Sequence, residues 1–288
     1  MKQIDFMALR FYAYVISAVL VIVSILSLYW KGLNLGLDFT GGTVIEVRYF
    51  PKVDIGKVRE AVEKAGLSSV QVQDTASGTV LVKLKIGEPK EKALDALRKL
   101  GNAEIVSMET IGGVISSELR KKAMWSLLVA IGGILLYLGY RFEPVWSLSG
   151  IIALAHDVLV VIGAYSLTQK EINLDVVASF LIVAGYSVSD TVVVFDRIRE
   201  NLKIRKTADL KQIINLSINQ TLARTLMTSM TVFVVAFALF LLGGPVLSNI
   251  MFAFVIGIAV GTLSSIFVAS ALMLDIKRKF FKVGLQKA

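Results

Sequence analysis

The stretch YSVSDTVVVFDRIREN (residues 186–201) places an aspartate, Asp190, inside a run that otherwise has the composition of a membrane-spanning helix. The apolar run continues to Phe195, so the carboxylate lies before the point at which the helix would reach water. A charged side chain at the centre of such a helix costs about 2.5–3.5 kcal/mol on insertion scales, and such residues face the interior of a bundle and mark ion pathways. The stretch therefore predicts a membrane fold with an ionisable group in its interior.

Composition and length indicate a chain that crosses the membrane several times. The 288 residues are 55% hydrophobic, which is high for a soluble domain. A hydrocarbon core of about 30 Å is crossed by about 20 helical residues. Six stretches are long enough: residues 11–30, 123–140, 145–167, 174–195, 226–242 and 250–274. The first stretch is too long for a signal-peptide core and has no small-residue cleavage site, so we expect it to remain as an anchor.

Basic residues near the ends of these stretches indicate the orientation, because Lys and Arg are retained on the cytoplasmic side. They gather before the first stretch, in the loop 197–224 and in the basic tail 275–288. The residues are Lys2, Arg10, Arg197, Arg199, Lys203, Arg205, Lys206, Lys211, Arg224, Lys277, Arg278, Lys279, Lys282 and Lys287. Both termini are therefore expected in the cytoplasm. The same pattern accounts for the net charge of +9 without a nucleic-acid partner.

Residues 31–122 alternate between strand and helix periodicity and are expected on the periplasmic side. Strand patterns cover 43–50, 69–75, 79–85 and 103–111, and helical patterns cover 53–66 and 89–101. Ala76, Ser77 and Gly78 give a hairpin signal between the second and third strands. The order βαββαβ predicts a ferredoxin-like α+β domain. The predicted fold is thus an integral membrane bundle of six transmembrane α-helices, within residues 1–30 and 123–274, with this domain inserted after the first helix.

The sequence lacks the residues for most catalytic chemistry. It contains no cysteine and a single histidine, His156, which excludes thiol chemistry and multi-histidine metal sites. It has no G-x-x-x-x-G-K-[ST] loop for nucleotide phosphates. We therefore expect no enzyme activity and no cofactor, and we expect the outer domain to contact other proteins.

The candidate functional residues are polar groups inside the apolar stretches. Asp190 has Ser187 and Thr191 near it, and these small hydroxyl side chains allow close helix approach and internal hydrogen bonds. His156 and Asp157 lie near the middle of the third stretch. There they either contribute to a proton pathway or join helices through hydrogen bonds.

The cytoplasmic loop leads to a further charged residue, Arg224, at the start of the fifth stretch. Taken alone, Arg224 is interpreted as a cytoplasmic anchor. Before it, apolar residues recur at helical spacing: Leu210, Ile213, Ile214, Ile218 and Leu222. We expect an amphipathic helix that lies in the membrane interface, with the binding of a partner helix as the alternative.

Four motifs resemble those of one family. They are LGLDFTGGT (35–43), AHDV (155–158), YSVSDTVVVFDRIREN (186–201) and NQTLARTLMTS (219–229). Together they closely resemble the SecF family of protein-export membrane proteins, over essentially the whole chain. The resemblance implies a subunit that pairs with SecD in a unit related to the RND exporters. It also implies that Asp190 and Arg224 occupy the two charged positions of the family's proton pathway.

The expected function follows from this resemblance. It is a non-enzymatic accessory in the bacterial inner membrane that works beside the SecY translocon and uses protons to help unfolded preproteins across the lipid bilayer. Half of an RND-type small-molecule exporter and a passive scaffold for the translocon are the alternatives. The chain has no internal repeat of SDTVVVFDRIRE, so a partner is expected to supply the other half. Gly257 and Gly261, a G-x-x-x-G pair, lie either at the seam with that partner or at a contact within the chain.

Overall fold

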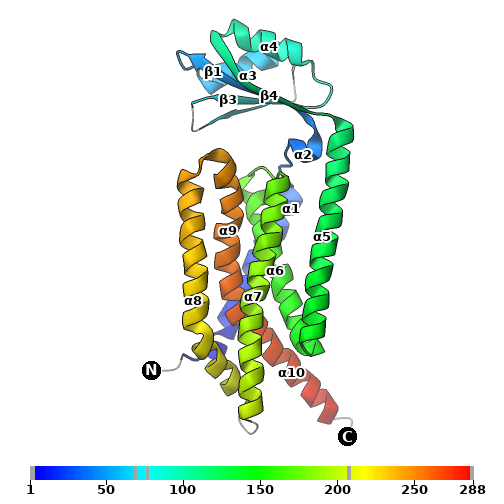
Figure 1. Ribbon diagram of the computed structural model, residues 1–288, viewed down its shortest axis with the longest axis vertical. Coiled ribbons are helices and arrows are strands. Elements are labelled where there is room, and N and C mark those ends of the chain that lie inside the picture. Colours follow the sequence, from blue (N-terminus) through cyan, green and yellow to red (C-terminus); the bar gives the residue numbers. More distant parts are fainter. Residues whose placement is uncertain (1–3, 68–69, 76–77, 206–208, 286–288) are drawn as a thin grey trace. The chain divides into compact units, whose positions relative to one another are not determined.

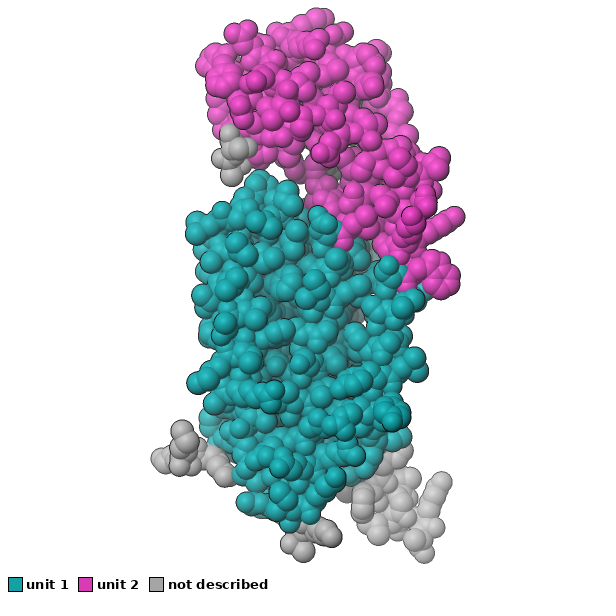
Figure 2. Space-filling model, in the orientation of Figure 1, with its two compact units in different colours: residues 1–34, 126–170, 175–288 teal, residues 35–125, 171–174 magenta. Residues whose placement is uncertain are grey.

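The computed structural model describes residues 4–67, 70–75, 78–205 and 209–285. The chain divides into two compact units, which Figures 1 and 2 show. The bundle consists of Met1–Asn34, Ser126–Lys170 and Asp175–Ala288, and the outer domain consists of Leu35–Trp125 and Glu171–Leu174. Some residues used for the predictions lie outside the described ranges: Ala76 and Ser77 of the hairpin, and Lys2, Lys206 and Lys287 of the orientation argument.

Six helices within the described residues are long and apolar enough to cross a membrane, which confirms the six predicted stretches. They are α1 (Arg10–Lys31), α5 (Gly113–Arg141), α6 (Pro144–Thr168), α7 (Leu174–Ile204), α8 (Leu210–Leu242) and a last run made of α9 (Gly244–Ser264), the π-helical turn η2 (Ser265–Ala269) and α10 (Ser270–Leu285). In α6 and α7 the apolar stretch is 50% buried, against 11% in α1 and α5. The last run is 44% buried, so α6, α7 and this run form the centre of the bundle.

Several helices extend beyond their apolar stretches. Helix α5 begins at Gly113, before the predicted start at 123, and α7 continues to Ile204, past the predicted end at 195. The added segments are rich in Glu, Lys and Arg, which are good helix formers in water. Hydropathy locates the part of a helix that fits the hydrocarbon core, and the helix itself continues where propensity allows.

The amphipathic segment 210–222 is the first part of α8, and the two roles expected for it, at the membrane interface or against a partner helix, are wrong. Its apolar side chains Ile213, Ile214 and Ile218 are fully or almost fully buried in the core of the bundle. An apolar face that is covered by its own chain is not available to lipid or to a partner.

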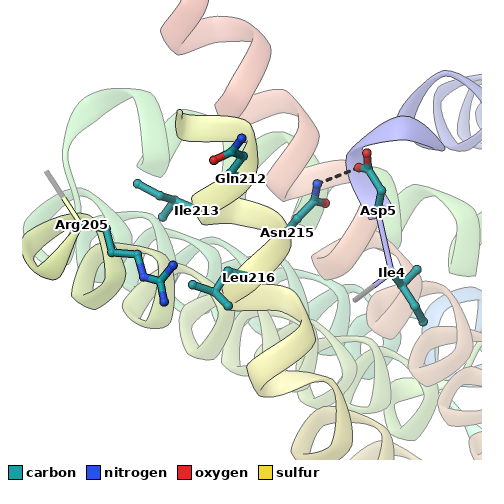
Figure 3. Close-up of a pocket in the computed structure, with 7 residues that line it drawn as sticks. All are labelled: Ile4, Asp5, Arg205, Gln212, Ile213, Asn215 and Leu216. Atoms are coloured by element: carbon teal, nitrogen blue, oxygen red, sulfur yellow. Dashed lines mark hydrogen bonds between the residues drawn. The ribbon is translucent and has the colours of Figure 1, made fainter. Parts of the chain in front are cut away.

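Part of that cover comes from the N-terminal segment. Phe6 and Met7, in the short helix η1 (Phe6–Ala8), belong to the same buried core. The amide of Met7 donates to Oδ1 of Asn215 (3.0 Å). Nδ2 of Asn215 donates to Asp5 (2.7 Å), as Figure 3 shows. A hydrogen bond from Lys211 lowers the pKa of the Asp5 carboxyl. The N-terminal segment is therefore fixed to the start of α8 by both apolar and polar contacts.

The outer domain contains a four-stranded antiparallel sheet in the order β2-β3-β1-β4. Its strands are β1 (Gly42–Phe50), β2 (Gln71–Asp74), β3 (Val80–Leu84) and β4 (Asn102–Ile111). Helix α3 (Ile55–Lys64) follows β1, and α4 (Lys90–Lys99) follows β3. This order and pairing confirm the predicted βαββαβ arrangement of a ferredoxin-like domain.

The core of the outer domain is formed by residues that recur at the strand period of two and at the helical period of 3.6. Alternate residues of β1, namely Ile45, Val47 and Tyr49, are buried, and Val58 and Val62 of α3 are buried with them in one cluster. Thr43 continues this alternation, and the side chains of Val44, Glu46, Arg48 and Phe50 are more exposed. One face of the sheet is thus covered by helices, as is common for antiparallel sheets.

Candidate functional site

Asp190 lies on α7 and is buried, with 7% of the residue exposed. Its Oδ2 accepts a hydrogen bond from the hydroxyl of Ser229 on α8 (3.1 Å). Ser229 in turn accepts from Oγ1 of Thr262 on α9 (2.9 Å). A short chain of hydroxyls therefore connects the carboxylate to two neighbouring helices.

Asp157 lies on α6 and is even less exposed, at 1%. Its Oδ2 accepts from Ser187 on α7 (2.5 Å) and from Ser264 on α9 (2.6 Å). Its Oδ1 lies 2.9 Å from Nδ1 of His156, which donates when the carboxylate is ionised. The other ring nitrogen of His156 is buried and has no hydrogen-bond partner within the described part of the chain. Asp157 thus connects α6, α7 and α9 at one point.

Two glycines allow α9 to approach α7 closely enough for these bonds. A Cβ added at Gly261 would lie 3.0 Å from Cβ of Ser187, and one added at Gly257 would lie 2.1 Å from a methyl group of Val183. The G-x-x-x-G pair therefore packs within the chain, and its assignment to the seam with a partner is wrong. Small residues at such a contact let two backbones come close in lipid, where no hydrophobic effect drives helices together.

The helix geometry changes where Asp157 is bound. Ser264 is the last residue of α9, and the π-helical turn η2 follows it directly. The hydroxyl of Ser270, the first residue of α10, donates to the carbonyl of Ser265, the first residue of that turn (3.0 Å). Single π-helical turns inside α-helices occur frequently at functional sites.

The predicted residue Thr191 faces a different neighbour from the one expected. It is buried, and its methyl group lies 3.7 Å from the position that a Cβ at Gly150 of α6 would take. It therefore packs against α6, and Ser187, which was expected beside Asp190, donates to Asp157 instead.

Arg224 lies on α8 and is exposed in the chain by itself. It makes no ion pair with Asp190 or with any other carboxylate in the ranges that the structure describes. Between Arg224 and Ser229, the hydroxyl of Thr225 is buried, and no described residue pairs with it. Polar groups on α8 thus extend from Arg224 towards the position of Asp190.

The structure therefore distributes the six predicted residues over two hydrogen-bonded clusters, the packing contact of Thr191 with α6 and one exposed position. His156, Asp157 and Ser187 come together, whereas Asp190 lies in a separate cluster and Arg224 lies apart from both. The prediction missed Ser229, Thr262 and Ser264, each of which contacts a carboxylate directly or through one hydroxyl. The only signal for them was a small polar side chain within an apolar stretch. Among the described residues, no group of three His, Asp or Glu side chains is placed to hold a metal ion.

Two family models match the chain. The model described as Protein export membrane protein SecD/SecF, C-terminal, matches residues 90–279, and the SecD/SecF GG Motif matches residues 31–49. The first covers most of the bundle, including both carboxylates, and the second covers the connection from α1 to the outer domain.

Whole-chain relatives agree with these matches. A protein of Calditerrivibrio nitroreducens named Protein translocase subunit SecF is 40% identical, over 96% of this chain and 95% of the relative. Its namesake from Vibrio alginolyticus is also 40% identical, over 99% of this chain and 91% of the relative. The crystal structure of SecDF from Thermus thermophilus, described as a translocon-associated membrane protein, superposes with a TM-score of 0.88 at 37% identity. The match covers 96% of this chain but only 39% of the SecDF chain. The chain is a multi-pass membrane protein and belongs to the SecF family of protein-export membrane proteins.

Proposed function

We propose that the chain is the SecF subunit of a Sec protein translocase and that, together with SecD, it uses the proton gradient to help secreted polypeptides leave the SecY channel. In this proposal it binds no cofactor and catalyses no covalent reaction. The names of its relatives support the translocase role, and the position of Asp190 supports the use of protons.

The burial of Asp190 carries the proposal. An ionised carboxylate in an apolar bundle needs several donors or a cation, and within the described residues Asp190 has one hydroxyl donor, Ser229. Uptake of a proton removes that requirement and changes how α7 and α8 are held together. In the proposed cycle Arg224 approaches the carboxylate when it is ionised and moves away when it is protonated.

The share of SecDF that the chain covers supports a SecD partner. The match takes up 39% of the Thermus thermophilus SecDF chain, and the motif around Asp190 occurs once in this sequence. In the proposed assembly SecD supplies a second set of helices, and the exposed side of α8 with Arg224 is available to it. The basic residues at both ends and in the loop 197–224 support cytoplasmic termini and a periplasmic outer domain in a bacterial inner membrane.

The gradient supplies enough free energy for such a cycle. One charge that crosses a potential of 100 mV releases about 2.3 kcal/mol. This biases a two-state equilibrium by a factor of about 50, because 1.4 kcal/mol corresponds to a factor of ten. The transfer of one proton therefore releases enough free energy to drive a change in the packing of α7 against α8 that costs about 2 kcal/mol.

The test is export into vesicles that contain the full chain, SecD and the SecY channel, measured with and without an uncoupler. We expect Asp190→Asn to abolish the gradient-dependent part of export while the uncoupled rate and the assembly with SecD remain. Asp196→Asn is the matched control, because Asp196 is on the same helix but is partly exposed and paired with Arg141 (2.9 Å). It should retain gradient-dependent export.

Two results would contradict the proposal. If Asp190→Asn exports at the wild-type rate under a gradient, the chain acts as a passive scaffold. If the wild-type protein shows no gradient dependence but exports a hydrophobic small molecule, the exporter alternative holds.

A further inference from the structure

The segment that follows α1 is bonded to the short connection that precedes α7. Leu35 forms a parallel β-bridge with Ile172, and the amide of Gly36 donates to the carbonyl of Ile172 (2.9 Å). The carboxylate of Asp38 accepts from the amide of Leu174 (2.9 Å). All of these residues belong to the outer domain, which includes Glu171–Leu174 as well as the sheet.

Glycines fix this segment in place. A Cβ at Gly36 would lie 1.5 Å from Oδ1 of Asn173, so only glycine allows the two segments to pass so closely. Gly42 has φ +136°, and a Cβ there would lie 2.1 Å from the carbonyl oxygen of Leu84 in β3. The segment 35–42 is therefore packed against the connection 171–174 at one end and against the sheet at the other.

A charged contact adds a second link between the sheet and the connection. Lys83 of β3 forms an ion pair with Glu171, and both side chains are largely buried, with 14% and 19% exposed. Burial lowers the pKa of Lys83, which reflects how little water reaches its ammonium group. Ion pairs shielded from water are screened less by salt than surface pairs, so this link persists at physiological ionic strength.

Asp38 also has a specific relation to α7. Leu174 is the first residue of α7, and its amide is one of the donors that a helix leaves unpaired at its N-terminus. The carboxylate of Asp38 pairs with this amide and lies at the positive end of the helix dipole. Asp190 lies 16 residues further along the same uninterrupted helix, about 24 Å at a rise of 1.5 Å per residue.

The connection between α1 and the outer domain is less direct. Helix α1 ends at Lys31, and Gly32 after it has φ +66°, so the chain leaves the helix before the motif begins. The motif LGLDFTGGT (35–43) instead contacts α7 through the hydrogen bond between Asp38 and Leu174, the first residue of that helix. A displacement of Leu174 along the axis of α7 would therefore act directly on its hydrogen bond to Asp38.

We propose that Leu35–Ile172, Asp38–Leu174 and Lys83–Glu171 form a clamp that holds the outer domain to the N-terminal end of α7, and that Asp38 is a positioning residue that couples this domain to Asp190. The proposal rests on the proposed function, because it assigns the step by which a protonation change at Asp190 reaches the outer domain. The clamp stays closed throughout the cycle, so the outer domain follows α7.

The first test uses hydrogen exchange of the assembled complex in vesicles. We expect Asp190→Asn to change the exchange of residues 80–84 at least threefold relative to the wild type, and Asp38→Ala to remove this difference. Asp54→Ala is the matched control, because Asp54 caps α3 through the amide of Gly56 (2.6 Å) and, among the described residues, makes no hydrogen bond to the connection before α7. If Asp190→Asn has no effect on residues 80–84, or if the effect survives Asp38→Ala, the clamp does not couple the two. This readout does not require export, so it separates the clamp from the proposed function.

The second test closes the clamp covalently. The sequence has no native cysteine, and residues paired across a β-bridge lie within the Cα separation of a disulfide, about 4.4–6.8 Å. We expect Asp38→Ala to reduce gradient-dependent export at least fivefold. In the Asp38→Ala variant, an added disulfide between Leu35→Cys and Ile172→Cys should restore at least half of the lost gradient-dependent export. A reductant should reverse this rescue. Asp38→Asn keeps an acceptor oxygen and should retain at least half of the activity. If the oxidised pair alone stops export in an otherwise wild-type chain, the clamp must open and the proposal is overturned.

Discussion

The two buried carboxylates of the bundle are held in different ways. Asp157 accepts hydrogen bonds from Ser187 and Ser264 and has His156 against its other oxygen. Asp190 has one described donor, Ser229. Both residues are more than nine-tenths buried, so burial alone does not distinguish them.

The number of donors gives the two residues different roles. A buried carboxylate whose two oxygens are both paired stabilises one packing, whereas a buried charge with too few partners is costly. We infer that Asp157 joins α6, α7 and α9 as a structural centre and that Asp190 is the group whose protonation changes. The geometry thus favours the helix-joining interpretation of His156 and Asp157 over a part in the proton pathway.

To test this comparison, we expect the largest effect on the free energy of unfolding from Asp157→Ala. The change leaves Ser187, Ser264 and His156 without their acceptor, and each unpaired donor destabilises the fold. Hydrogen bonds in membrane bundles average about 0.6 kcal/mol, and bonds to charged groups are stronger, so we expect the free energy of unfolding to fall by about 2–4 kcal/mol. Unfolding in mixed detergent micelles measures it. Asp175→Ala, in the exposed first turn of α7, is the control, and equal stability of the two variants would mean that Asp157 is not a structural centre.

A smaller effect is expected when single donors to Asp157 are removed. Ser187→Ala and Ser264→Ala should each lower the free energy of unfolding by about 0.5–1.5 kcal/mol. The double variant should lose more than the sum, because residues that share one acceptor are coupled. Ser149→Ala is the matched control, since Ser149 is equally buried on α6 but donates within its own helix (2.7 Å). Strict additivity in the same unfolding assay would contradict a shared centre.

The fold could be predicted from the sequence because its signals are local. Apolar stretches of about 20 residues identify membrane helices, and the change between a period of two and a period of 3.6 identifies the strands and helices of the outer domain. The start of α8 shows where local signals stop. Periodicity revealed the apolar face of residues 210–222, but its cover includes Phe6 and Met7, which are remote in sequence.

The candidate site was predictable only in part, for a related reason. Helical spacing places Ser187 and Asp190 on one face of α7. The spacing within one helix gives no information about which neighbouring helix that face contacts. Which neighbouring helix supplies the acceptor depends on tertiary packing, and Ser187 donates to Asp157 on α6. Ser229 and Ser264 were missed because one hydroxyl in an apolar stretch has the same pattern whether it contacts a carboxylate or bonds its own backbone.

The smallest effect on stability, and the sharpest test of the comparison, is expected at Ser229. Ser229→Ala removes the one described donor to Asp190, yet the protonated carboxyl needs no donor of this kind, so the free energy of unfolding should change by less than about 1 kcal/mol. Gradient-dependent export should instead slow by twofold to fivefold, because the ionised state of the cycle has lost its hydrogen bond. Thr262→Val is the matched control, since Thr262 donates to Ser229 and not to the carboxylate (2.9 Å). It should slow export less than twofold. If Ser229→Ala instead destabilises the bundle as much as Ser264→Ala does and leaves export unchanged, both carboxylates are structural, and the distinction between them is wrong.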